Sequence, residues 1–230
     1  MSVEEIFEKA LSENRKNLSL GEAFAVCEYY GLPLLGYRFI GVDEEVPEAL
    51  GLSYPVVVKV DSPDIVHKTE YGGVKTGIKS REELVKAIED IKRSVKAKNP
   101  NARINGFIVQ EQVSNAHEVI IGGLKDEQFG PVIAFGLGGV LVEILRDVAF
   151  DIAPITPQEA RDLITRIKGY QILEGYRGIP KANIDALSEV LSKASRMFAD
   201  IAKYVKEMDL NPTFVSSEWV KIADARFTLL

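Results

Sequence analysis

The stretch Tyr54–Ile78, YPVVVKVDSPDIVHKTEYGGVKTGI, decides the fold. An apolar run of β-branched residues is followed by a polar loop, and a second short run begins after two glycines. Such runs, separated by turn-forming residues, predict a β-hairpin. Lys59 lies in the first run, so a buried strand would bring one positive charge into the sheet. A cation in that position suits a nucleotide phosphate.

The loop of this hairpin contains the second feature of interest. Gly72 and Gly73 are free to adopt positive φ, and successive amides in such a turn can form an anion-binding nest. His67 precedes them and is one of only two histidines. We expect it to be exposed, where it could act as a general base, a metal ligand or a nucleophile that carries a phosphoryl group. An ordinary surface histidine is the alternative.

Length and composition limit the possible functions. A chain of 230 residues is long enough for one large α/β domain or two lobes with separate cores. The net charge of -6, without long charged runs, argues against nucleic acid and against a basic membrane-binding face. The single cysteine, Cys27, excludes an intrachain disulfide and is predicted to be buried. With an acidic amphipathic start and no apolar run of membrane-spanning length, the sequence predicts a cytoplasmic protein.

Helical and strand patterns alternate along the chain, which predicts an α/β fold in the broad sense that includes α+β. Helical spacing predicts helices at residues 3–13, 21–30, 44–50, 80–96 and 184–205, with another that begins after Thr156. Besides the central hairpin, strands are predicted at residues 34–40, 106–113, 118–124 and 131–135, with a closing hairpin at residues 208–227.

The closing hairpin contains a candidate metal site. Asp209 and Asn211 are two residues apart, so on a strand both side chains point to the same face, and Asp224 is expected on the partner strand. Hard oxygen ligands in this arrangement suit Mg²⁺, which keeps its other positions for water and phosphates. The alternative is a turn in which Asp and Asn side chains bind their own backbone.

Two further features carry less information. His117 precedes Glu118 at the start of a predicted strand and is interpreted as a surface residue. The run Gly136–Gly139 follows a strand, and such a cluster indicates tight packing as often as phosphate binding.

Taken in order, the segments VVVKV, HKTEYGGVKTGI, IVQEQV, EVIIGGLKDEQFGPVIAFGLGGVLVEILRDVAFDIAPI, DLNPTFV and ADAR resemble a known family. The chain is similar, over nearly its whole length, to the ATP-grasp subunit of ADP-forming acyl-CoA synthetases, and most of all to the β subunits of archaeal ADP-forming acetyl-CoA synthetases. These are relatives of succinyl-CoA synthetase. The resemblance implies a two-lobed ATP-grasp fold, with the N-terminal helices and first lobe in residues 1–112. Residues 113–230 would form the second lobe, which carries the metal-binding hairpin.

The resemblance also assigns roles to residues. His67 matches a phosphohistidine that these enzymes have and succinyl-CoA synthetase lacks. The implied nucleotide-binding positions are Lys59 at the phosphates, Gly72, Gly73 and Val74 in the glycine loop, Glu111, Gln112 and Val113 at the adenine hinge, and Glu118 near the ribose. The implied magnesium ligands are Asp209, Asn211 and Asp224, with Asp209 in the place of a glutamate of succinyl-CoA synthetase. Arg146 and Asp147 lie in the shared stretch, but no role is assigned to them.

The resemblance finally implies a reaction and a partner. Acyl-CoA, ADP and phosphate would give the acid, coenzyme A and ATP, with Mg²⁺ as cofactor and a coenzyme A-binding α subunit completing an α2β2 heterotetramer. His67 would carry the phosphoryl group to ADP on a mobile loop, residues 61–71. Two alternatives stay open: a self-contained ATP-grasp carboxylate ligase, and a non-catalytic nucleotide-sensing subunit that regulates a partner.

Overall fold

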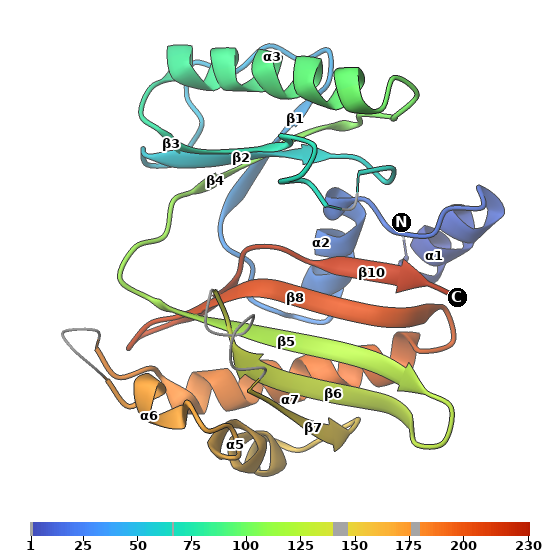
Figure 1. Cartoon of the computed structure of the whole chain (residues 1–230), viewed down its shortest axis with the longest axis vertical. Coiled ribbons are helices and arrows are strands. Elements are labelled where there is room, and N and C mark those ends of the chain that lie inside the picture. The colour runs from blue at the N-terminus through green and yellow to red at the C-terminus, as the bar shows by residue number, and fades with distance from the viewer. Residues whose placement is uncertain (1, 66, 140–146, 176–179) are drawn as a thin grey trace. The chain divides into compact units, whose positions relative to one another are not determined.

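The computed structural model describes residues 2–65, 67–139, 147–175 and 180–230. The chain divides into two compact units (Figure 1). The smaller unit contains residues 17–22 and 35–112, and the larger unit contains residues 1–16, 23–34 and 113–230. Each unit has its own antiparallel sheet, so the fold is α+β.

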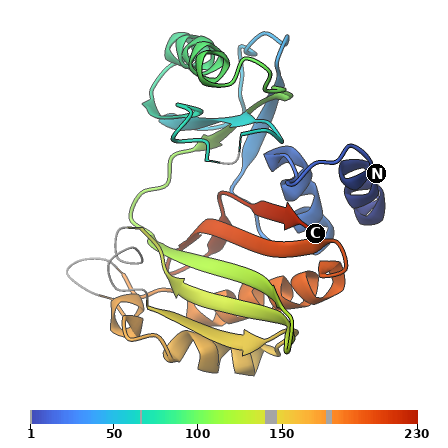
Figure 2. The ribbon, with the colours of Figure 1, turned by 45° about the vertical axis from the view of Figure 1, so that its right-hand side comes forward.

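The smaller unit is a four-stranded antiparallel sheet with one long helix on one face (Figure 2). The strands lie in the order β1-β4-β2-β3, and the helix α3 packs against β2 and β3. The bounds are β1 Tyr37–Gly41, β2 Val56–Asp61, β3 Val74–Ile78, α3 Arg81–Lys98 and β4 Gly106–Glu111. The central hairpin predicted from the sequence is therefore present as β2 and β3, which pair antiparallel.

Local sequence explains this unit. Ser80 caps α3, because its side chain accepts a hydrogen bond from the Glu83 amide, as the sequence predicted. Val56, Val58 and Val60 alternate along β2 and enter the core beneath α3. The helix predicted at residues 44–50 is wrong: these residues form no helix, and Pro47 lacks the amide that a helix interior needs.

The larger unit is a six-stranded antiparallel sheet in the order β10-β8-β5-β6-β7, with β9 paired to β8. The strands are β5 His117–Asp126, β6 Gly130–Leu137, β7 Val148–Ile152, β8 Val205–Val215, β9 Val220–Ile222 and β10 Arg226–Leu229. The helices of this part of the chain are α1 Val3–Ser12, α2 Leu20–Tyr29, α5 Pro157–Thr165, α6 Tyr170–Leu173 and α7 Ile184–Ile201. α7 lies along one face of the sheet and contacts β5, β6 and β8, and α5 packs against α7 (Figure 1).

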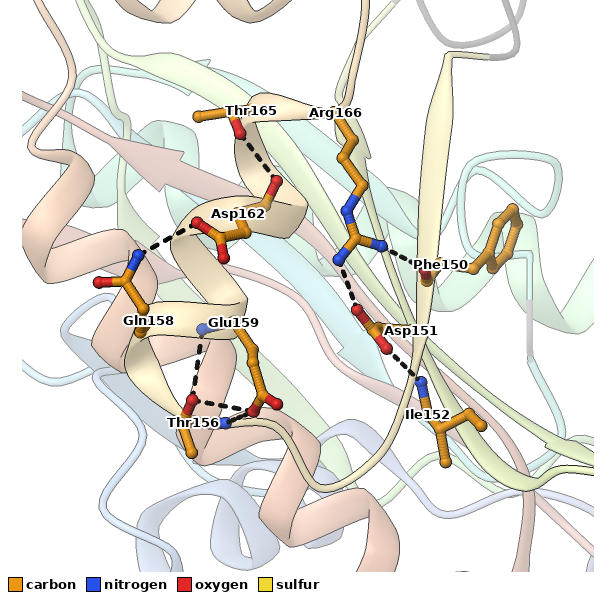
Figure 3. A network of polar contacts seen from close by, with 9 residues as sticks. All are labelled: Phe150, Asp151, Ile152, Thr156, Gln158, Glu159, Asp162, Thr165 and Arg166. Atoms are coloured by element: carbon orange, nitrogen blue, oxygen red, sulfur yellow. Dashed lines mark hydrogen bonds and ion pairs between the residues drawn. The ribbon is translucent and has the colours of Figure 1, made fainter.

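The helix α5 is also tied to the edge strand β7 (Figure 3). The guanidinium of Arg166, just after α5, donates to the carbonyl of Phe150 at 3.3 Å and to the carboxylate of Asp151 at 2.7 Å. Thr156 and Glu159 form the capping box that begins α5. Arg166 therefore occupies a backbone acceptor of the edge strand, which otherwise would be open to pairing with another strand.

The N-terminal helices do not group as the sequence suggested. The ring of Phe7 on α1 stacks on Tyr204 at 5.1 Å between centroids and meets Phe227 edge-on at 6.5 Å. These contacts place α1 in the larger unit, whereas the expected division put residues 1–112 together. Cys27 is fully buried, as predicted, and burial raises the pKa of its thiol. Within the described ranges, no helix is both long and apolar enough to cross a membrane.

Candidate functional site

Lys59 lies in the middle of the sheet of the smaller unit. It pairs with Val74 on β3 and with Ile108 on β4, and its side chain is buried, with 7 % of its surface exposed. Because side chains alternate along a strand, Lys59 and Asp61 point away from the valines that pack under α3. Asp61 is held by the Gly21 amide at 2.8 Å and the Asn105 side chain at 3.0 Å. The lysine thus occupies a defined position on the face of the sheet opposite α3.

His67 is exposed, as the sequence predicted, and lies at the start of a closed turn. Its carbonyl accepts hydrogen bonds from the amides of Glu70 at 3.0 Å and Tyr71 at 3.4 Å. The amides of Gly72 and Gly73 donate to carbonyls within the same turn, at 3.0 and 2.7 Å. The expected anion nest is therefore not formed in this conformation, because both glycine amides already have acceptors. We call residues 67–73 the histidine segment.

The predicted adenine hinge lies where the two units divide, between Gln112 and Val113. The carboxylate of Glu111 accepts the Ser53 amide at 2.7 Å, and the side chain of Gln112 accepts the Gly77 amide at 2.7 Å. Gly77 has a φ of +71° and sits at an irregularity of β3, so Gln112 fastens the hinge to a β-bulge. The Gln112 amide also donates to the Pro55 carbonyl at 2.9 Å, so the hinge is held to the smaller unit at three points.

In the larger unit, one face of the sheet carries several predicted site residues. On β5, Val119 and Ile121 are buried, whereas Glu118 is exposed and points to the face away from α7. Asp209 on β8 pairs directly with Gly122 on β5 and shares this face. Glu118 and Gly122 are four residues apart, about 13 Å along a strand. The predicted ribose and metal positions therefore lie on one face of the sheet, about 13 Å apart along the strand direction.

The three predicted metal ligands lie in one region of the larger unit. Asp209 and Asn211 are both on β8, and Asp224 lies between β9 and β10, not on a strand as expected. The register of β8 against β5 shifts at Asn211, where a β-bulge re-aims the exposed amide side chain. A hydrogen bond of 3.0 Å from Ala223 to the carbonyl of Pro212 brings the loop with Asp224 beside this bulge.

Asp209 also has a cationic neighbour that the sequence did not single out. The guanidinium of Arg226 on β10 lies 3.6 Å from its carboxylate, and the two residues are register partners. Two carboxylates and an amide are a hard oxygen set of the kind that binds Mg²⁺. Over the parts of the chain that the structure describes, no group of three or more His, Cys, Asp or Glu side chains forms a metal site. The side chains of Asp209, Asn211 and Asp224 offer oxygen donors, which suit Mg²⁺ better than a softer metal.

Asp147, which had no role from the sequence, has a clear structural one. Its two carboxylate oxygens accept the amides of Lys168 at 2.8 Å and of Gly169 at 2.6 Å, and 9 % of the residue is exposed. It thereby fixes the turn between α5 and α6 against the start of β7. Its partners are 21 and 22 residues away, so no sequence pattern could have shown it. Arg146 lies outside the described residues.

The interpretation of His117 as a surface residue is wrong. It is buried at the start of β5, and its Nε2 lies 2.7 Å from the carbonyl of Pro180. Since a carbonyl can only accept, Nε2 carries the proton and donates. His117 therefore anchors a loop, and His67 is the exposed histidine of the pair.

Comparisons with known proteins identify the family of the chain. A family model described as an ATP-grasp domain matches residues 9–229. The chain belongs to the ATP-grasp family. It is 40 % identical over 226 residues to the β subunit of ADP-forming acetate–CoA ligase I of Pyrococcus furiosus, covering 98 % of this chain and 97 % of that one. It is 43 % identical to ADP-forming acetate–CoA ligase I of Archaeoglobus fulgidus, but spans only 33 % of that longer protein. This ATP-grasp chain is thus of the kind found as β subunits of ADP-forming acetate–CoA ligases.

Solved structures give the same result for the ATP-grasp chain. The dinucleotide-forming acetyl-coenzyme A synthetase 1 of Ca. Korarchaeum cryptofilum, with coenzyme A and Ca-AMPCP, matches all of this chain and all of that one, with a TM-score of 0.92 and 40 % identity. A second structure of that enzyme has a phosphorylated phosphohistidine segment (TM-score 0.87, 39 % identity, full coverage of both chains). A third holds Mg-AMPPCP, with this segment pointing towards the nucleotide site (TM-score 0.84, 37 % identity, full coverage of both chains).

Proposed function

We propose that this chain is the nucleotide-binding subunit of an ADP-forming acetyl-CoA synthetase and that His67 carries the phosphoryl group to ADP. The observation that carries the proposal is the exposed His67 at the start of a compact segment. The chain also matches, end to end, a chain of an enzyme whose structures contain a phosphohistidine segment. Acyl-CoA, ADP and phosphate are converted to the acid, coenzyme A and ATP.

The chemistry assigned to His67 is two displacements at phosphorus. Acyl-CoA and phosphate first give an acyl phosphate and coenzyme A on the partner subunit. The phosphoryl group then reaches His67, whose neutral ring nitrogen donates its lone pair to phosphorus while the bond to the previous carrier breaks. In the second displacement, a β-phosphate oxygen of ADP attacks, the N–P bond breaks and the electron pair returns to the ring. Lys59 neutralises part of the phosphate charge, and such transfers depend mainly on positioning and charge stabilisation.

Asp209, Asn211 and Asp224 are proposed to hold Mg²⁺ through their side-chain oxygens. When bound, the ion neutralises charge on phosphate oxygens. Glu118, on the same face of the sheet as Asp209, is proposed to bind the ribose hydroxyls. The position of Glu118 and Asp209 on neighbouring strands of one sheet supports this assignment.

Further nucleotide contacts are proposed for residues 72–74 and 111–113. Glu111, Gln112 and Val113 are proposed to bind adenine, and one side-chain oxygen of each of the first two fixes the hinge by accepting the Ser53 or Gly77 amide. Gly72, Gly73 and Val74 are proposed to close over the phosphates. The glycine amides must first leave the carbonyls that they bind within the histidine segment.

A partner is required, because the proposed reaction includes coenzyme A chemistry that none of these residues performs. We propose a coenzyme A-binding α subunit in an α2β2 heterotetramer that works in the cytoplasm. The β-subunit names of relatives covered over nearly their whole length support a two-chain enzyme.

The test is labelling with γ-³²P-ATP and Mg²⁺, with and without the α subunit, followed by mapping of acid-labile, base-stable label. We expect label on His67 and none in His67→Asn, which should keep its affinity for ADP. His117→Gln is the matched control, because the glutamine amide can still donate to the Pro180 carbonyl, and it should keep the label. Label on His117, or loss of ADP binding in His67→Asn, would contradict the proposal.

A further inference from the structure

The histidine segment is a small closed body. Four of its amides donate to carbonyls within it: those of Glu70, Tyr71, Gly72 and Gly73. The shortest of these bonds, 2.7 Å, runs from Gly73 to the carbonyl of Lys68. These bonds lie inside the segment, whose last residue is also tied to β2, because the Val60 amide donates to the Gly73 carbonyl at 2.8 Å.

The helix α3 holds this body from one side. The hydroxyl of Ser94 donates to the carbonyl of Tyr71 at 2.8 Å, and the ammonium of Lys98 donates to the carbonyl of Glu70. Ser94 and Lys98 are four residues apart, so they lie on the same face of the helix. Gly72 has a φ of +66° and leaves no room for a Cβ atom beside the Ser94 hydroxyl. The segment and the helix therefore fit closely, and two donors of α3 bind consecutive carbonyls.

The chain is also fixed just before His67. Ile65 is 2 % exposed and belongs to the core beneath α3. The carboxylate of Asp64 accepts the Arg103 amide at 2.8 Å. While Ile65 stays in the core, the Cα atom of His67 is confined to about 7 Å from that of Ile65, the length of two extended residues. The α3 contacts hold the middle of the segment and the Val60 amide holds its end at the Gly73 carbonyl, so a swing of His67 through this range requires that the α3 contacts break.

We infer that Ser94 and Lys98 are positioning residues that hold the histidine segment docked on α3 and set the equilibrium between its docked and released states. This rests on the proposed role of His67 as a phosphoryl carrier. A carrier that serves two reactants spends part of each cycle at each of them. A change in the stability of the docked state must therefore change the rates of the two half-reactions by different factors.

The test measures both half-reactions in the complete two-subunit enzyme: phosphorylation of His67 by ATP, and its phosphorylation from acetyl-CoA and phosphate. Ser94→Ala should change the ratio of the two rates about fivefold, the effect of one net hydrogen bond on an equilibrium. Lys98→Met keeps the aliphatic part of the side chain and should change the ratio of the two rates about two- to threefold. The expected change is smaller than for Ser94→Ala because Lys98 is exposed to water. Lys98→Arg restores a donor and should return the ratio towards wild type.

A matched control and a second readout separate positioning from stability. Lys86→Met removes another exposed lysine of α3, two turns before Ser94, and should leave the ratio unchanged. Hydrogen exchange at the Gly72 and Gly73 amides should be faster in Ser94→Ala and unchanged in Lys86→Met. If both half-reactions fall by the same factor, or the ratio does not move, the positioning role is wrong while His67 remains the carrier. If wild-type enzyme takes no label at His67, both proposals are wrong.

Discussion

Replacement of Asp147 tests a buried carboxylate whose two oxygens each hold a backbone amide. Each of its oxygens accepts one backbone amide, at 2.8 and 2.6 Å. Asp147→Asn leaves a single acceptor and turns an NH₂ group towards the other amide, whereas Asp147→Ala removes both acceptors. Hydrogen bonds to a charged group contribute about 1.5–3 kcal/mol each, and Lys168 is exposed enough for water to replace part of this. We therefore expect losses of about 2 kcal/mol for Asn and about 3 kcal/mol for Ala in the free energy of unfolding.

Urea unfolding followed by tryptophan fluorescence measures this loss, because the single tryptophan, Trp219, lies in the same unit as Asp147. With a slope of about 2 kcal/mol per molar urea, the midpoint should fall by about 1 M in Asp147→Asn. Asp126→Asn is the matched control: one oxygen of Asp126 accepts both the Gln128 and Phe129 amides, so an asparagine oxygen can keep both bonds. Equal urea midpoints for the wild type and Asp147→Asn would refute the reasoning. An equal fall of the midpoint in Asp147→Asn and Asp126→Asn would also refute it.

Three further predictions follow from the described contacts. Gly72→Ala should destabilise the protein more than Gly77→Ala, and urea unfolding measures the difference. Both glycines have positive φ, which costs about 1–2 kcal/mol for alanine. Of the two, only Gly72 has a side chain, that of Ser94, where the Cβ atom would lie. The Thr156 amide at the N-cap of α5 donates to the Glu159 carboxylate and holds the pKa of Glu159 below its ordinary value. The contribution of Glu159 to stability is therefore complete above the unfolded-state pKa and is lost as pH falls through the folded-state pKa. NMR titration should find the lowered pKa, and an ordinary pKa would contradict the prediction. Arg226→Met should increase the affinity for Mg²⁺ about two- to fivefold, measured by calorimetry in the absence of nucleotide. The reason is that the guanidinium of Arg226 competes with the ion for the partly exposed Asp209 carboxylate. An unchanged Mg²⁺ affinity would count against Asp209 as a ligand.

Local sequence signals predicted the fold well where they are sufficient by themselves. The cap at Ser80 and the proline after Thr156 marked two helix starts, and the β-branched run from Val56 marked the central strand. The helix predicted at residues 44–50 does not form, because Pro47 lacks the amide that a helix interior needs. Whether each of these helices and strands forms depends on residues within about four positions along the chain.

Contacts between distant residues could not be predicted. The rings of Phe7, Tyr204 and Phe227 meet across nearly the whole chain, and they decide the unit to which α1 belongs. His117 is buried because a loop 63 residues away supplies the Pro180 carbonyl. The local sequence around each of these residues is compatible with an exposed side chain. Only the folded chain shows whether the side chain is buried or exposed.

The glycine pair shows why a motif does not by itself define a site. Gly72 and Gly73 can present amides to a phosphate, and they can also close a turn, since both uses need the same freedom from a side chain. In this conformation the amides donate to Thr69 and Lys68, and the pair lies against Ser94 and Val60, where a Cβ on Gly73 would come within 2.7 Å of the valine. One amide proton cannot make a full bond to a carbonyl and to a phosphate at once. A phosphate-binding role for these glycines therefore requires the histidine segment to open, which couples the binding of nucleotide to the movement of His67.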